Sequence, residues 1–219
     1  MELILEKPPH PFYPFFKRLF DFFFSLCFIT LFSPLYLVIA GLIKLDSKGP
    51  IFYVGKRLGK GGKYIKVLKF RTMYSDAEKR LQEMLKNDPK VREEWEVFQK
   101  LQQDPRCTPI GKFLRKTSLD EFPQFFNVLK GDLSVVGPRP HFIFELEENE
   151  NSPLRKYAHL VLAVKPGITG LWQVSGRSRL SYEDRVELDS LYMKRQSFFY
   201  DLMVIFKTIP IVLFSKGAF

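Results

Sequence analysis

The residues best suited to chemistry lie in the segment TSLDEFPQ, residues 117–124. Ser118 and Glu121 have the spacing of a capping box, in which a serine begins a helix and a glutamate three residues later binds back to the serine backbone. Asp120 would then lie in the first helical turn, where the helix dipole favours an ionised carboxylate and free N–H groups favour a bound phosphate. Such a carboxylate can attack phosphorus as a nucleophile. The same pattern also serves as a plain helix cap, and the local sequence leaves both interpretations open.

Basic side chains that could bind a phosphate group occur beside turn residues along the chain. Arginine suits this role because its guanidinium group can make two parallel hydrogen bonds to phosphate, and loops commonly display binding residues. Each of these side chains could equally be a surface charge, and the sequence alone does not bring them together in space. The candidates are Lys69, Arg71, Arg115, Arg139 and Arg177.

The composition limits the class of protein and of partner. The chain has 219 residues, a formal net charge of +10, 46% hydrophobic residues and 16% aromatic residues. This length suits one compact domain, and the apolar content excludes a disordered chain. The basic excess favours an anionic partner such as nucleic acid, lipid headgroups or a phosphorylated substrate. The two cysteines and three histidines are scattered, which argues against a disulfide scaffold or a zinc site.

The candidate membrane element is residues 22–43, which carry no formal charge. A straight helix of this length could cross the hydrocarbon core of a bilayer. The pair Ser33-Pro34 lies in its middle, however, where proline removes a backbone donor. Basic residues flank both ends, which draws both ends toward the cytoplasmic side. A helix–break–helix that enters and leaves by one face and a single span therefore both remain possible. The Pro-rich residues 1–16 are expected to be extended and not helical.

Shorter elements are expected after this apolar segment. Residues 50–59 and 63–70 surround the turn GKGG and are rich in β-branched and aromatic residues, which predicts a β-hairpin. The glycine turn matches neither a P-loop nor a dinucleotide-binding pattern, so a structural role is favoured. The stretches KGDLSVVGPRP and KPGITGLWQVSGR read as loops. Helices are predicted within 74–105, after Thr108-Pro109, within 141–164, from Ser181 to about Gln196, and over the apolar residues 198–214, which suit the membrane interface.

Four sequence blocks in this order resemble the bacterial sugar transferase family, the small monotopic phosphoglycosyl transferases. The blocks are residues 17–53 (KRLFDFFF to KGPIFY), LKFRTM at 68–73, residues 108–141 (TPIGKFLRKTSLDEFPQ to VVGPRPH) and VKPGITGLWQVSGRS at 164–178. The resemblance extends from about Lys17 to the C-terminus. Four blocks in order are far more specific than any one of them.

The resemblance implies a mechanism and a set of functional residues. The membrane element would be a re-entrant helix broken at Ser33 and Pro34, and the catalytic residues would be Asp120 and Glu121. Asp120 would attack the sugar-bearing phosphate of a UDP-sugar and release UMP, and polyprenyl (undecaprenyl) phosphate would then take the sugar phosphate to give polyprenyl-diphosphate-sugar. Mg²⁺ is the expected cofactor, held at Asp120, and the sugar is expected to be a hexose. Substrate and phosphate contacts are expected from Lys69, Arg71, Arg115, Arg139, Gln173 and Arg177.

These observations predict an α+β, mostly helical, monotopic membrane protein with a re-entrant helix-break-helix, a small β-hairpin and interfacial amphipathic helices. Residues 1–16 would form the Pro-rich segment, 17–48 the membrane-inserted helix, and 49–219 a catalytic domain on the cytoplasmic face of the bacterial inner membrane, with 17–219 as one functional unit. The larger family members carry extra N-terminal helices, so this chain is expected to be a minimal catalytic form. A homodimer is compatible with the sequence, and no nucleic-acid partner is expected. The alternatives are a basic binding module on the membrane, a non-catalytic scaffold and a single-pass form of the same enzyme.

Overall fold

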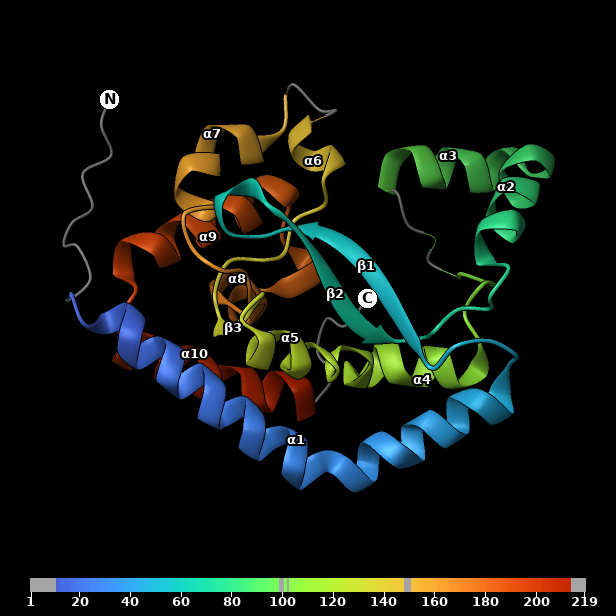
Figure 1. Cartoon of the computed structure of the whole chain (residues 1–219). Coiled ribbons are helices and arrows are strands. Elements are labelled where there is room, and N and C mark those ends of the chain that lie inside the picture. The colour runs from blue at the N-terminus through green and yellow to red at the C-terminus, as the bar shows by residue number, and fades with distance from the viewer. Residues whose placement is uncertain (1–10, 99–100, 102, 148–150, 214–219) are drawn as a thin grey trace.

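A long bent helix runs along one side of the molecule, and the other elements gather on its inner side (Figure 1). The computed structural model describes residues 11–98, 101, 103–147 and 151–213. Helices dominate, with two small two-stranded sheets, which confirms the predicted α+β, mostly helical class. The remaining residues, which include most of the Pro-rich segment and the end of the predicted C-terminal helix, lie outside the described part of the chain.

Helix α1 spans Tyr13–Asp46. It begins inside the segment that was expected to be extended, so the prediction for residues 13–16 was wrong. The reason is that Pro14 lies in the first turn of the helix, where a missing N–H costs nothing because it would have no partner within the helix. By length and composition, α1 is the one helix in the described residues that could cross a membrane.

The predicted break at Ser33-Pro34 is a bend within one continuous helix. Pro34 lies inside α1, and Figure 1 shows the helix changing direction in its middle. Pro34 has no N–H to donate to the carbonyl group of Thr30, four residues earlier. The Ser33 hydroxyl donates to that carbonyl at 2.9 Å instead. A serine before the proline thus satisfies the acceptor that the proline leaves open, and the helix bends without ending.

The predicted hairpin is confirmed. Strands β1 (Phe52–Leu58) and β2 (Tyr64–Phe70) pair in antiparallel fashion, with Phe52 opposite Phe70 and Leu58 opposite Tyr64. The turn between them is a short 3₁₀ segment, Lys60–Gly62. Two of its glycines have positive φ, which supports the structural interpretation of GKGG.

The helices after the hairpin begin largely where capping residues predicted. The Thr108 side chain accepts the backbone N–H of Gly111, and Ser181 forms a capping box with Asp184. The predicted helical region 141–164 contains two shorter helices. The helices are α2 (Ala77–Asn87), α3 (Pro89–Phe98), α4 (Pro109–Thr117), α5 (Gln124–Lys130), α6 (Phe144–Glu147), α7 (Pro153–Val161), α8 (Leu171–Ser175), α9 (Tyr182–Arg195) and α10 (Phe198–Leu213).

The two stretches that read as loops contain a pair of very short parallel strands. β3 (Ser134–Val136) and β4 (Gly167–Thr169) pair with Val136 opposite Thr169. Just beyond them, a Cβ atom on Gly167 would lie 2.1 Å from the backbone nitrogen of Gly137. The two backbones can approach this closely only because both residues are glycine. This contact brings the loop that carries Arg139 beside the start of the segment that continues into α8, which carries Gln173, and the 3₁₀ turn that carries Arg177.

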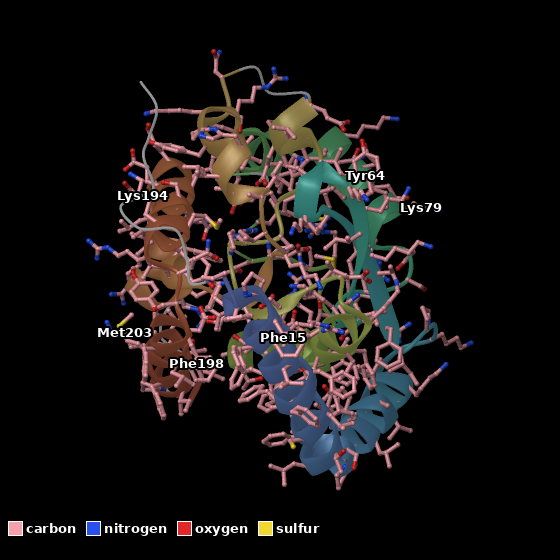
Figure 2. All side chains as sticks on the ribbon, turned by 60° about the vertical axis from the view of Figure 1, so that its left-hand side comes forward. Phe15, Tyr64, Lys79, Lys194, Phe198 and Met203 are labelled. Carbon is pink, nitrogen blue, oxygen red and sulfur yellow. The ribbon has the colours of Figure 1, made fainter. Side chains whose placement is uncertain are left out.

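Helices α1 and α10 expose apolar side chains on one side of the molecule. Phe15 on α1 and Phe198 on α10 are labelled in Figure 2, where mainly carbon atoms cover this end and the charged Lys79 and Lys194 lie away from it. Phe15 is 66% exposed, and Leu37, after the bend, is 75% exposed. Such a continuous apolar surface is typical of a membrane-contacting face.

Candidate active site

The turn that carries Asp120 and Glu121 (the dyad) is a 3₁₀ segment, Leu119–Glu121, between α4 and α5. The predicted capping box was wrong. Ser118 has a left-handed backbone with φ of 59° and ends α4, and its side chain makes no cap hydrogen bond to the turn. Asp120 therefore lies in a tight turn and not in the first turn of a long helix. Its environment must come from tertiary contacts and not from a helix dipole.

Helix α1 supports this turn with side chains on its inner face. The Tyr36 hydroxyl donates to the backbone carbonyl of Phe122 at 2.6 Å. The rings of Phe28 and Phe32, two turns and one turn before Tyr36, lie with centroids 5.0 and 5.8 Å from the Phe122 ring. Because these three α1 side chains flank the bend at Pro34, the dyad rests directly on the bent part of the helix.

Lys69 on β2 binds both carboxylates of the dyad. Its ammonium nitrogen lies 2.6 Å from a Glu121 oxygen and 3.8 Å from a Asp120 oxygen. Asp120 is only 8% exposed. Lys69, which was expected to contact a substrate phosphate, thus lies beside both carboxylates. Its charge offsets the repulsion between the two adjacent acids.

The two carboxyl groups titrate differently because their surroundings differ. Burial raises the pKa of Asp120 to about 6, against the lowering effect of the Lys69 charge and with a further rise from Glu121. Burial also acts to raise the pKa of Glu121, but the ion pair with Lys69 and the charges of Arg139 and Arg177 outweigh it, so that pKa lies below its usual value. At neutral pH both carboxylates are ionised, and Asp120 is the more basic of the two.

Arg115, which precedes the dyad on α4, and Arg177, which follows α8, both act on the dyad or on its turn. The Arg115 guanidinium donates to the Thr72 hydroxyl at 2.9 Å, and its charge acts on Asp120. Arg177 donates to the Ser118 hydroxyl at 3.1 Å. Ser118 and Arg177 are the two non-glycine residues with positive φ in the described part of the chain. Backbone strain of this kind concentrates at functional sites, and here both strained residues touch each other beside the dyad.

Arg139 lies on the loop after β3, and Gln173 lies on α8, which follows β4. The charge of Arg139 acts on Glu121, and its guanidinium carbon lies 5.2 Å from the centroid of the Trp172 ring. The Gln173 side chain lines a pocket of about 240 Å³ together with Arg177 and Arg179. Its oxygen is buried and has no hydrogen-bond partner within the described protein, so it could accept from a substrate.

Arg71 has a different place from the one expected. Its guanidinium donates to the backbone carbonyl groups of Ile43, Ser47 and Lys48 at the end of α1, and the residue is 6% exposed. These bonds satisfy carbonyl groups that a helix C-terminus leaves without partners. The structure therefore gives Arg71 the role of fastening α1 to the hairpin.

Sequence reasoning missed several residues that surround Arg139. Arg57 on β1 and Arg185 on α9 lie near Arg139, because the positive charge of Arg139 lowers the pKa of both guanidinium groups. His141 lies between two carboxylates, with Glu145 at 3.1 Å and Asp189 at 3.6 Å. A basic residue within a predicted strand was the available signal for Arg57. Nothing local marked Arg185 or Asp189, because α9 reads as an ordinary amphipathic helix.

The donor set at the dyad fits a divalent cation that is shared with a substrate. No group of three His, Cys, Asp or Glu side chains within the described residues could hold a metal ion. Asp120 and Glu121 nevertheless provide two adjacent carboxylates. Mg²⁺ is commonly held by one or two carboxylates and completed by substrate phosphates and water. The site can therefore combine a buried nucleophilic carboxylate with cations that neutralise a phosphate group.

Comparison with known proteins agrees with this chemistry. Residues 12–215 match the family described as bacterial sugar transferase. The chain is 44% identical over 203 residues to the exopolysaccharide production protein ExoY of Sinorhizobium fredii, covering 93% of this chain and 88% of that protein. It is 45% identical over 205 residues to the undecaprenyl-phosphate galactose phosphotransferase of Salmonella typhimurium, covering 94% of this chain and 42% of that protein.

A third relative is the UDP-glucose:undecaprenyl-phosphate glucose-1-phosphate transferase of Klebsiella pneumoniae. It is 44% identical over 209 residues, which cover 93% of this chain and 41% of that protein. This chain thus matches nearly all of ExoY and less than half of the two longer proteins. The family match covers the bent helix, the dyad and all the cationic residues around it, and the resemblance seen in the sequence is confirmed. The chain belongs to the bacterial sugar transferase family and is a phosphoglycosyl transferase.

Proposed function

We propose that this enzyme transfers a hexose-1-phosphate from a UDP-sugar to undecaprenyl phosphate, with release of UMP and formation of undecaprenyl-diphosphate-hexose. The reaction takes place at the cytoplasmic face of the bacterial inner membrane and begins the synthesis of a surface polysaccharide. The names of the relatives support the donor, the acceptor and the pathway class: one is named for UDP-glucose and undecaprenyl phosphate, another for exopolysaccharide production.

The observation that carries this proposal is the position of the Asp120 carboxylate. It is 8% exposed, lies 3.8 Å from the Lys69 ammonium group, and belongs to a turn supported by the bend of α1. A membrane-bound acceptor presents its phosphate at the headgroup level. A nucleophile held directly above a membrane-inserted helix can reach that phosphate without drawing the lipid out of the bilayer.

In the first half-reaction, a carboxylate oxygen of Asp120 attacks the sugar-bearing phosphorus of the donor. The bond from that phosphorus to the oxygen bridging it to UMP breaks, and UMP leaves with the electron pair. The product on the protein is a mixed anhydride between Asp120 and the sugar phosphate. Lys69 and Arg115 neutralise the charge on the transferred phosphate, which otherwise repels the carboxylate.

In the second half-reaction, an oxygen of undecaprenyl phosphate attacks the same phosphorus. The bond between the phosphorus and the Asp120 oxygen breaks, and the carboxylate is regenerated, so no net proton is consumed. Splitting the transfer lets the two anionic substrates react with the enzyme one after the other. Glu121, held by Lys69 at 2.6 Å, keeps the lysine beside Asp120 and can share a bound cation.

Mg²⁺ is part of the proposal. Asp120 and Glu121 would hold it together with the donor diphosphate, and it would supply charge neutralisation at the phosphorus. We expect removal of divalent cations by a chelator to abolish UMP release, and readdition of Mg²⁺ to restore it.

The test is UMP release by purified protein with Mg²⁺, undecaprenyl phosphate and a panel of UDP-hexoses, with incubation of a radiolabelled donor in the absence of acceptor. We expect label on the protein that is lost when undecaprenyl phosphate is added. Asp120→Asn should give no labelled protein and no turnover, whereas Asp76→Asn, an exposed carboxylate on the approach to α2 paired with Arg80, should behave as the parent protein. Turnover at the parental rate in Asp120→Asn would overturn the covalent mechanism.

A further inference from the structure

Three guanidinium groups from three separate elements gather beside the dyad around two aromatic rings. Arg139 lies on the loop after β3 and Arg185 on α9, and their guanidinium carbons are 5.2 and 5.5 Å from the centroid of the Trp172 ring. Arg57 on β1 lies 3.6 Å above the centroid of the Phe142 ring. We name these three residues the arginine cluster. Aromatic faces hold the guanidinium groups in fixed orientations.

The charges of the arginine cluster repel one another. Burial and the nearby charge of Arg139 lower the pKa of Arg57 and of Arg185. The groups that raise the pKa of Arg57 are Tyr53, Glu145 and Glu121, and Glu145 raises that of Arg185. Glu145 and Glu121 are themselves bound to His141 and Lys69. The cluster therefore holds like charges together at a cost in free energy, and an anion bound among them would relieve that cost.

Buried groups build the position of Arg139. Its backbone N–H donates to the Asp189 carboxylate at 3.0 Å, and Asp189 is fully buried on α9. The backbone N–H of Phe142 donates in the same way to Glu145 at 2.8 Å. His141 lies between these two carboxylates. Burial acts to lower its pKa, but the hydrogen bonds and charges of the two acids raise it above the usual value, so the imidazole pairs with both.

The arginine cluster lies on the Glu121 side of the dyad. The largest cationic influences on Asp120 are Lys69 and Arg115, whereas Glu121 experiences Lys69, Arg139 and Arg177, and Arg57 experiences the charge of Glu121. Lys69 thus acts on both carboxylates, whereas Arg115 acts on Asp120 and Arg139 and Arg177 act on Glu121. In an in-line displacement at phosphorus, the leaving group departs opposite the nucleophile. A phosphate leaving group thus needs its own cationic site, apart from the cations at the attacking carboxylate.

We propose that the arginine cluster binds the phosphate of the departing nucleotide, with Arg57 and Arg185 as substrate-binding residues alongside Arg139. This inference rests on the proposed function, because it takes UMP as the leaving group. The guanidinium groups stabilise the charge that develops on the UMP phosphate as the bridging bond breaks. They also hold UMP after the transfer, which predicts product inhibition by UMP.

The test is direct binding of UMP, measured calorimetrically with purified full-length protein in detergent and Mg²⁺, with uridine as the comparison ligand. We expect Arg57→Gln and Arg185→Gln each to weaken UMP binding by about ten- to a hundredfold, since each removes charge-assisted hydrogen bonds to phosphate. Arg57→Lys and Arg185→Lys should recover part of the affinity. The affinity for uridine should be the same in all variants.

Matched controls are available on the same elements. Lys56 is exposed beside Arg57 on β1, and Arg195 is exposed in the last turn of α9, so Lys56→Gln and Arg195→Gln should bind UMP as the parent does. UMP affinity within twofold of the parent in both Arg57→Gln and Arg185→Gln, or equal losses for UMP and uridine, would overturn the assignment. Binding requires no turnover. A parent protein that binds UMP but transfers no sugar phosphate would therefore count against the proposed function and leave this assignment standing.

Discussion

The buried Asp120 carboxylate is held in an environment that opposes its ionisation. Its pKa of about 6 arises first from burial and then from the balance of Lys69 against Glu121. An ordinary aspartate would be ionised at every physiological pH but would be a weaker base. Raising the pKa toward 6 makes the carboxylate more nucleophilic while leaving it ionised at pH 7.

The rate of the first half-reaction should report this pKa. Only ionised Asp120 can attack, so kcat/KM for the UDP-sugar should be flat above about pH 6 and fall about tenfold per pH unit below it. Single-turnover UMP release without acceptor is the appropriate measurement, because a phosphate monoester such as the lipid acceptor also titrates near 6. A profile that is flat down to pH 4.5 would contradict the assignment of Asp120 as nucleophile.

Lys69→Met should move that acidic limb to higher pH. The lysine charge lowers the pKa of Asp120, so removing it makes the carboxyl group harder to ionise. The exposed Lys66, on the same strand, provides the matched control, and Lys66→Met should keep the parental profile. An unmoved limb in Lys69→Met would show that the lysine does not act on Asp120 electrostatically.

The same burial should make Asp120 a cost to stability. The folded protein holds the Asp120 proton up to about pH 6, whereas the unfolded chain releases it near 3.8, so ionisation above pH 6 favours unfolding. Asp120→Asn should therefore raise the free energy of unfolding at pH 7 by on the order of 1–3 kcal/mol, while abolishing transfer. The gain should shrink as the pH falls from 6 toward 4. Denaturant titrations of both proteins at pH 7 and pH 4.5 measure it, and an equal gain at both values would point to another cause.

At the scale of single elements, the bend of α1 sets the relative direction of the two halves of the helix (Figure 1). The Ser33 hydroxyl donates a hydrogen bond to the Thr30 carbonyl, to which Pro34 has no N–H to donate. In a bilayer an unsatisfied carbonyl group is costly. The pair therefore permits a stable bend at membrane depth. Because Phe28, Phe32 and Tyr36 support the dyad across this bend, the shape of α1 and the height of Asp120 above the membrane are linked.

We expect both ends of α1 to lie on the cytoplasmic side. Single cysteines at the exposed positions Phe12 and Lys48, in a Cys27→Ser background because Cys27 is also exposed, should react with an impermeant reagent from that side alone. Pro34→Ala restores a backbone donor and should straighten the helix, so the two labels should become accessible from different sides and UMP release should fall. Labels on opposite sides in the parent protein would establish a single span.

The sequence predicts correctly those helices whose ends are set by residues close to them in the sequence. Thr108 and the Ser181–Asp184 pair cap their helices as expected because a cap is a contact over three residues. The pattern at Ser118 failed because the end of α4 takes that residue into the left-handed region first. Arg71 looked like a phosphate ligand but serves the end of α1, a contact that no local pattern encodes. Arg57 and Arg185 were missed for the same reason, since only tertiary structure places Arg57 over Phe142 and Arg185 over Trp172.

At the scale of the whole molecule, Asp201 joins the two ends of the chain. Its carboxylate accepts hydrogen bonds from Tyr13 at 2.9 Å and Lys17 at 2.6 Å on α1, and from Tyr192 at 2.7 Å on α9. The residue is 3% exposed. An acid on the largely apolar α10 thus points into the protein and not toward its exposed apolar face. This contact holds α1 and α10 side by side, so that their exposed apolar side chains form one surface. The turn that carries the dyad packs against α1.

Breaking that contact should loosen the membrane-facing surface without touching the dyad. Asp201→Asn leaves the mostly buried Lys17 charge without its counter-ion, which should cost about 3–5 kcal/mol in the free energy of unfolding. Lys17→Met combined with Asp201→Asn removes both charges, so the double variant should be more stable than Asp201→Asn alone. Thermal unfolding in detergent and flotation with anionic vesicles measure the two consequences, stability and membrane attachment. The loss in free energy of unfolding in the double variant could instead equal the sum of the losses in Asp201→Asn and Lys17→Met. That result would show that the two charges act independently, and α10 would then be held by apolar packing alone.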